Sequence, residues 1–308
     1  MNFFQIISEI EKVDPEVYGR LDSRRRVFKN MMGLGKNLSA AALPLAVGAI
    51  FNKAYAQTPA GAGVNDVLNF ALKLEYLESY FYQQRTALVG LSPINAAGLA
   101  LIATDEANHV NFLKGVLTPA NAIPDPTAAQ FDFTAGGLFA DYRTNPATYL
   151  ALAQSFEDTG VRAYKGAAPL VMSNKTVLTA ALNIHSVEAR HASHLREMRR
   201  SDVSSATPSM GIPVAPYSAK PKSWISGTDG GGAVPGKTDA IYGAGNNTGA
   251  PAGVMFVSES TPGFASNAAT AGFPAEAFSE AFDEGLDVGT VAKIAKMFVV
   301  PTSTLFNY

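Results

Sequence analysis

Four long stretches in the middle of this chain place apolar residues at helical spacing, and they constrain the fold more than any other feature. Each is about 25 residues long, which corresponds to about 37 Å of α-helix. Ser92 and Asn145 each stand before a proline, and an N-cap residue followed by proline is typical of a helix start. Helices of nearly equal length pack well as a bundle. The four stretches cover residues 64–89, 93–117, 146–171 and 174–200.

The connections between the stretches select one bundle topology. Only a few residues join the first stretch to the second and the third to the fourth, so we expect each pair to pack antiparallel. Residues 118–144, which contain three prolines and Gly136-Gly137, join the second stretch to the third. We therefore predict an all-α four-helix bundle with one long crossover in residues 57–200.

Residues 1–56 are predicted to be an N-terminal leader. A basic cluster at 23–29 contains Arg25-Arg26, an apolar run follows at 38–51, and a small-residue cleavage pattern ends at Ala56. Basic, apolar and small-residue regions in this order are typical of an export signal, here of the twin-arginine type. We expect a periplasmic or extracellular protein. The acidic residues before Arg25 are unusual for a signal, so the alternative is a cytoplasmic protein with an N-terminal helical hairpin.

Residues 201–308 form a C-terminal extension of different composition. Of the 27 glycines in the chain, 12 lie between Gly211 and Gly272, where apolar runs are few. We predict loops with a short strand near 254–257, followed by two short helices at 274–284 and 287–299. The sequence does not say whether this extension folds alone, wraps the bundle or meets another subunit.

Composition excludes several classes of protein. The chain has 24 Lys and Arg against 26 Asp and Glu, so it carries no basic footprint for nucleic acid. It has no cysteine, which excludes disulfides, a thiol nucleophile and cysteine-ligated metal sites. The apolar run of the leader is about 14 residues, whereas a membrane helix needs about 20. We expect no stable membrane span after cleavage of the leader.

The four histidines of the chain include two that follow a glutamate by three positions. Glu106 and His109 lie in the second stretch, and Glu188 and His191 lie in the fourth. Residues i and i+3 share one face of a helix, so each pair can present two ligands to a single point.

The first and third stretches complete the pattern. Glu75 precedes Glu106 by 31 residues, and Glu157 precedes Glu188 by the same 31 residues. A tyrosine follows the first glutamate of each half by seven positions. The chain is therefore built from two related helix pairs, and antiparallel packing brings each lone glutamate level with a Glu-x-x-His pair.

On these residues the chain resembles the ferritin-like superfamily. Residues 72–82 and 156–164 are similar to the exported, desiccation-related branch, and the paired spacing also resembles that of dimanganese catalases. The resemblance covers about residues 64–200 and implies a ferritin-like bundle that holds two Fe or two Mn ions. Four carboxylates match the charge of two divalent cations, and imidazole ligands favour Fe or Mn over Mg or Ca. The expected ligands are Glu75, Glu106, His109, Glu157, Glu188 and His191.

Some residues near the expected ligands have more than one possible role. Glu78 lies one turn from Glu75 and could replace it as a ligand. His185 and His194 lie on opposite faces of their helix, so they cannot both be ligands and are expected beside the site or at the surface. Asp105 and Asp158 each adjoin a ligand and are expected to lie at the surface or to orient an imidazole.

Three aromatic residues complete the list of candidates. Tyr82 and Tyr164 are expected to be core residues whose hydroxyl groups are hydrogen-bonded, or alternatively to pass electrons to a redox metal. Phe112 is expected to be part of the apolar core.

Two functions fit this site. The first is a dimetal redox protein that reacts bound Fe or Mn with O2 or hydrogen peroxide, in a ferroxidase-like or catalase-like reaction. The second is a non-catalytic envelope or extracellular stress protein whose metal site is structural or vestigial. A homo-oligomer is compatible with the sequence.

Overall fold

The computed structural model describes residues 63–201, 238–242 and 285–307. The leader, the strand predicted at 254–257 and the helix predicted at 274–284 lie outside the described residues. Among the helices that are described, none combines the length and the apolar character needed to cross a membrane.

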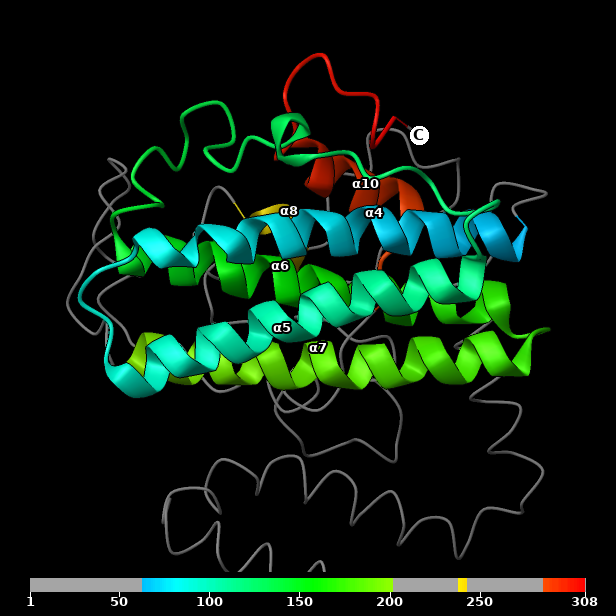
Figure 1. Ribbon diagram of the computed structural model, residues 1–308, viewed down its shortest axis with the longest axis horizontal. Helices are drawn as coiled ribbons and strands as arrows, with labels where there is room; N and C mark the ends of the chain where they lie inside the picture. The colour runs from blue at the N-terminus through cyan, green and yellow to red at the C-terminus, as the bar shows by residue number, and fades with distance from the viewer. Residues whose placement is uncertain (1–62, 202–237, 243–284, 308) are drawn as a thin grey trace, which may run out of the picture.

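Four long helices lie side by side and form the bundle that the sequence predicts (Figure 1). The chain runs along α4, returns along α5, crosses over the bundle and then runs out and back along α6 and α7. Short 3₁₀ turns, η1 (Gln84–Ala87) and η3 (Ala168–Val171), continue the first and third helices. The described architecture is all-α with one long crossover, as predicted. The helix bounds are α4 Val64–Gln83, α5 Pro93–Leu117, α6 Pro146–Ala167 and α7 Lys175–Ser201.

Side-chain caps fix where these helices begin. The Ser92 hydroxyl accepts a hydrogen bond from the Asn95 backbone N–H, and the Asn145 side chain accepts one from the Ala147 N–H. Each cap satisfies a backbone donor that has no partner within its own helix. At the start of α4 the Asp66 carboxylate instead accepts from the N–H of Gly63.

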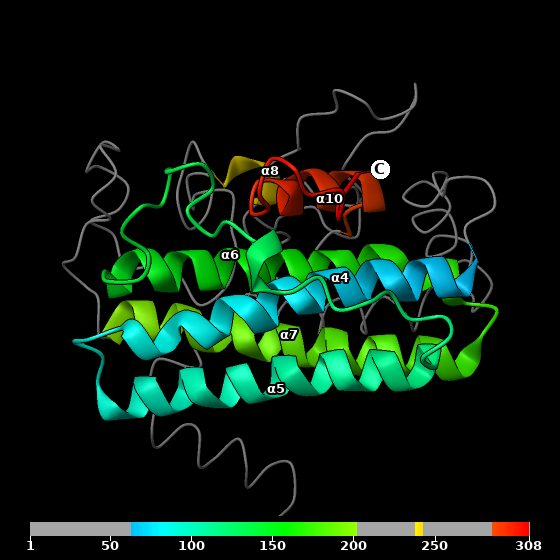
Figure 2. The ribbon, with the colours of Figure 1, turned by 45° about the horizontal axis from the view of Figure 1, so that its top comes forward.

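The described part of the C-terminal extension covers the outer side of α6. Helix α10 (Val288–Lys296) and the short α8 (Asp239–Tyr242) lie over the layer that α4 and α6 form (Figure 2). Asp287 caps α10 by accepting from the Thr290 N–H, and α10 lies within the range 287–299 predicted for the last helix. Because α10 and α8 pack against its outer face, α6 is buried continuously from Ala147 to Tyr164.

The crossover and the C-terminal segment also bind each other through their backbones. The N–H of Asp132 donates to the Phe298 carbonyl at 2.9 Å, and the N–H of Val300 donates to the Gln130 carbonyl at 3.0 Å. The ring of Phe298 packs edge-on against Phe156 of α6, with the ring centroids 4.7 Å apart. The C-terminal residues therefore contribute to the same core as the bundle.

A buried polar network joins α6, α7 and α8. The Asp158 carboxylate forms an ion pair with Arg196 at 2.6 Å and accepts a hydrogen bond from the Tyr242 hydroxyl at 2.5 Å. Gln154 donates to the Tyr242 oxygen at 3.2 Å. The expectation that Asp158 lies at the surface or orients an imidazole is wrong, because α8 covers this part of α6 and Arg196 reaches it from α7.

Candidate metal centre

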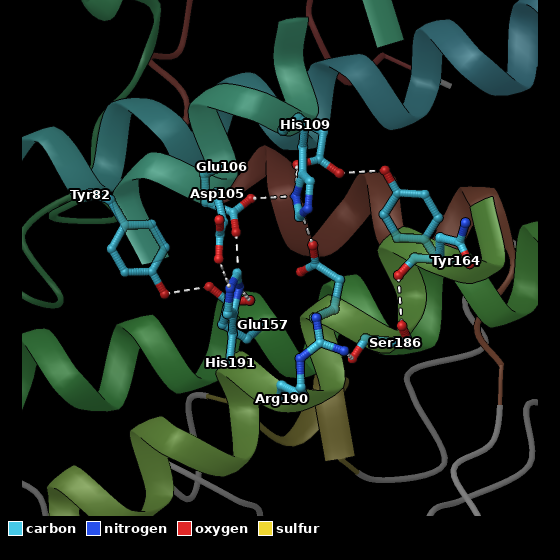
Figure 3. A network of polar contacts seen from close by, with 12 residues as sticks. Tyr82, Asp105, Glu106, His109, Glu157, Tyr164, Ser186, Arg190 and His191 are labelled. Carbon is cyan, nitrogen blue, oxygen red and sulfur yellow. Dashed lines mark hydrogen bonds and ion pairs between the residues drawn. The ribbon is translucent and has the colours of Figure 1, made fainter. Parts of the chain in front are cut away.

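Each of the four long helices carries part of one buried cluster at mid-bundle (Figure 3). The cluster consists of two overlapping groups of four residues, and within each group one ligand atom per residue lies within 4.8 Å of all the others. All four glutamates have no exposed surface. The groups are Glu75, Glu106, His109 and Glu188, and Glu106, Glu157, Glu188 and His191. The structure thus brings together all six residues that the sequence predicts as ligands.

In both histidines the Nδ1 atom faces the carboxylates. His109 Nδ1 lies 3.1 Å from Glu75 Oε2, 3.2 Å from Glu106 Oε2 and 3.2 Å from Glu188 Oε1. His191 Nδ1 lies 3.0 Å from Glu106 Oε1 and 3.2 Å from Glu157 Oε2. One imidazole nitrogen carries at most one hydrogen and cannot donate to three oxygens at once. The contacts around His109 therefore exceed what hydrogen bonding alone explains.

Two tyrosines bind the outer glutamates reciprocally, from opposite ends of the cluster (Figure 3). The hydroxyl of Tyr82 on α4 donates to Glu157 Oε1 on α6 at 2.5 Å, and the hydroxyl of Tyr164 on α6 donates to Glu75 Oε1 on α4. The other oxygen of each glutamate faces an imidazole. Both tyrosines are core residues with satisfied hydroxyls, and they hold each glutamate with one oxygen directed into the cluster.

The remaining candidates lie around this set. His191 Nε2 lies 3.2 Å from Asp105 Oδ2, so Asp105 orients that imidazole from the side away from the cluster. His185, His194 and Glu78 belong to neither group. Glu78 is nevertheless buried, and its α4 position places it against the cluster.

Burial and mutual repulsion disturb the protonation of the cluster. Burial and the nearby Glu157 raise the pKa of Glu106 to about 7, and burial with Glu106 raises the pKa of Glu188 well above its usual range. Burial alone would lower the pKa of His191, but the Glu106 and Glu157 carboxylates raise it to about 11. Without cations the cluster therefore favours proton uptake, and metal binding here is coupled to proton release.

Three carboxylate oxygens in the cluster indicate that cations fit it. Glu188 Oε2 is buried and accepts no hydrogen bond from any described residue, and Glu106 Oε1 and Glu188 Oε1 lie 3.0 and 3.2 Å from imidazole nitrogens that other carboxylates share. A buried carboxylate oxygen without a partner is costly, and a cation removes that cost. A cation about 2.1 Å from two donors at right angles keeps them about 3.0 Å apart, close to the distances around both Nδ1 atoms.

One further residue of the site is glycine. A Cβ atom at position 160 of α6 would lie 2.6 Å from Glu188 Oε2, so only glycine leaves that carboxylate its place in the cluster. Position 160 lies one turn beyond Glu157 and corresponds in the repeat to Glu78 of the first helix pair. Gly160 is not among the residues predicted from the sequence, although the comparison of the two halves that pairs the two tyrosines also pairs Gly160 with Glu78.

A four-helix bundle that brings four glutamates and two histidines to one buried point is the architecture of di-iron and di-manganese carboxylate proteins. The cluster is compatible with a dimetal site. Residues 63–201 match the family model for the ferritin-like domain, so this part of the chain is a ferritin-like domain, and the resemblance seen in the sequence is confirmed. No curated protein and no solved structure matched the chain.

Proposed function

We propose that this is an exported dimetal protein in which the six clustered side chains bind two Fe or two Mn ions that react with O2 or hydrogen peroxide. The observation that carries the proposal is the convergence of four fully buried glutamates and two histidines, whose ligand atoms lie within 4.8 Å of one another in each group. Bound metals of this kind supply the redox chemistry, while the protein supplies their binding, position and charge.

The two groups divide the ligands between two ions. Glu106 and Glu188 belong to both groups and would bridge the ions. Glu75 and His109 would bind only one ion, while Glu157 and His191 of the second helix pair would bind the other. The reciprocal tyrosines hold the outer glutamates in place, and Asp105 holds the imidazole of His191.

Turnover distinguishes this function from simple metal binding. We expect protein loaded with Fe(II) or Mn(II) without air to oxidise the metal, or to consume peroxide, when either oxidant is added. His191→Ala should slow this reaction about 100-fold or more, because it removes a metal ligand. Absorbance of the oxidised metal and an oxygen electrode measure the two reactions. His194→Ala, at an exposed position on the same helix, should react like the unmodified protein.

A non-catalytic role is the second candidate, and the complete burial of the four glutamates favours it. A metal that binds only to the folded protein stabilises it by mass action, which would suit a stress protein outside the cell. If the protein binds two ions but neither oxidant causes turnover, this structural role is the better account.

Export rests on the leader, which lies outside the described residues. If the twin-arginine route is correct, replacing Arg25-Arg26 with Lys-Lys should leave the full-length protein in the cytoplasm. Cell fractionation followed by immunoblotting measures this. Unchanged export would point to another route, and cytoplasmic retention of the unmodified protein would contradict export.

A further inference from the structure

A small cavity of about 30 Å³ lies inside the bundle at the Tyr164 end of the metal cluster. All four long helices contribute to its wall. Among the lining residues are Leu68 and Ala71 of α4, Leu113 and Val116 of α5, Tyr164 of α6 and Ala181 of α7.

The cavity adjoins the cluster directly. Ala71 precedes Glu75 by one turn of α4, and Leu113 follows His109 by one turn of α5, so each shares a helix face with a proposed ligand. Tyr164 contacts both the cavity and the cluster, because its ring lines the cavity while its hydroxyl donates to Glu75. A molecule in the cavity is separated from the cluster only by these side chains.

The lining favours a small apolar molecule. Every side chain that lines the cavity is apolar except that of Tyr164, whose hydroxyl already donates to Glu75. A water molecule in a protein interior needs about two to four polar partners, and hydrogen peroxide has similar needs. One water molecule needs a cavity of about 10–15 Å³, so a cavity of about 30 Å³ has room for a molecule of two heavy atoms.

The cavity wall also reaches the surface. Phe112 and Val116 line the cavity, yet their exposed fractions are 45% and 37%. The expectation that Phe112 belongs to the core is therefore wrong, because α5 has no described neighbour over this side chain. On this side of α5 the cavity is therefore bordered by partly exposed apolar side chains and is partly open to solvent.

The opposite end of the cluster is filled. The second helix pair repeats the first after 82 positions, so Met198 corresponds to Val116 and Leu99 corresponds to Ala181. Both larger side chains are buried, with exposed fractions of 1%. A Cβ atom added at Gly98 would lie 2.6 Å from Met198 Cε, so Met198 fills the space beside that position. Smaller residues at the Tyr164 end thus leave a cavity that the repeat does not require.

We propose that this cavity binds dioxygen and admits it to the metal cluster. The proposal rests on the redox function proposed above, and it selects O2 over hydrogen peroxide as the oxidant that enters at this end.

The internal repeat supplies the variants for a kinetic test. Ala181→Leu and Val116→Met place at this end the side chains that the filled end already contains. Each should slow oxidation of bound Fe(II) by O2 about tenfold or more, while oxidation by peroxide and the metal content stay unchanged. Ala97→Leu, at an exposed position of α5, is the matched control. Equal slowing with both oxidants, or no slowing with O2, would overturn the proposal.

Binding itself is tested without turnover. We expect dissolved O2, which is paramagnetic, to speed the NMR relaxation of the Leu68 and Leu113 methyl groups in protein exchanged into Zn(II). Their repeat counterparts, Leu150 and Leu195, are also buried and should respond less. An equal response at both ends would refute the cavity. If the protein shows no turnover with either oxidant, the proposed function fails, while this measurement still decides whether the cavity binds O2.

Discussion

Glu188→Gln is expected to abolish binding of both metal ions, whereas Glu75→Gln should abolish binding of only one. Glu188 belongs to both groups of ligands, and its Oε2 accepts no hydrogen bond from a described residue. An amide keeps the size of the side chain but removes the negative charge and replaces one ligand oxygen with an NH2 group. Glu75 belongs to one group, so its loss should leave the other ion in place.

Metal analysis of dialysed protein measures this difference. We expect about two ions per chain in the unmodified protein, about one in Glu75→Gln and close to none in Glu188→Gln. Glu197→Gln is the control, because Glu197 is an exposed glutamate on the same helix. Equal metal content in Glu188→Gln and Glu75→Gln would contradict the assignment of Glu188 as the bridging ligand.

Asp158→Ala is expected to lower the free energy of unfolding by about 3–5 kcal/mol. The change leaves the guanidinium of Arg196 buried without its carboxylate partner, and its exposed fraction is only 4%. The hydroxyl of Tyr242 loses its acceptor at the same time, which weakens the contact of α8 with α6. Urea unfolding followed by circular dichroism measures the loss.

Two variants show whether the ion pair is the cause. Arg190→Ala removes an exposed arginine of the same helix and should change the free energy of unfolding by about 0.5 kcal/mol or less. Adding Arg196→Met to Asp158→Ala removes the buried charge that has lost this carboxylate and should restore part of the stability. A loss below about 1 kcal/mol for Asp158→Ala would mean that water reaches Arg196 and that the network is not a buried one.

The bundle could be predicted because the sequence features that define it are local. Apolar spacing, the caps at Ser92 and Asn145 and the length of the crossover are each read within one stretch of chain. The convergence of the six polar side chains could also be predicted, because the spacing repeats between the two halves and antiparallel pairs align it. Their assignment as metal ligands stays a prediction.

Features that depend on contacts between distant segments could not be predicted. Asp158 is buried because α8, some 80 positions later, lies over it. The hydroxyls of Tyr82 and Tyr164 reach across to the glutamate of the other helix pair, whereas the sequence shows only the spacing within each helix. Phe112 is as apolar as a core residue and has the helical spacing of one. It is exposed only because no described helix packs over it.

The central claim is that six side chains from four helices bind two cations at one point. Anomalous X-ray diffraction from crystals grown with Mn(II) tests it most directly. The account predicts two anomalous peaks about 3.5–4 Å apart, one beside His109 and the other beside His191, with Glu106 and Glu188 between them. A cluster without anomalous density, in crystals whose protein is folded as described here, would contradict it.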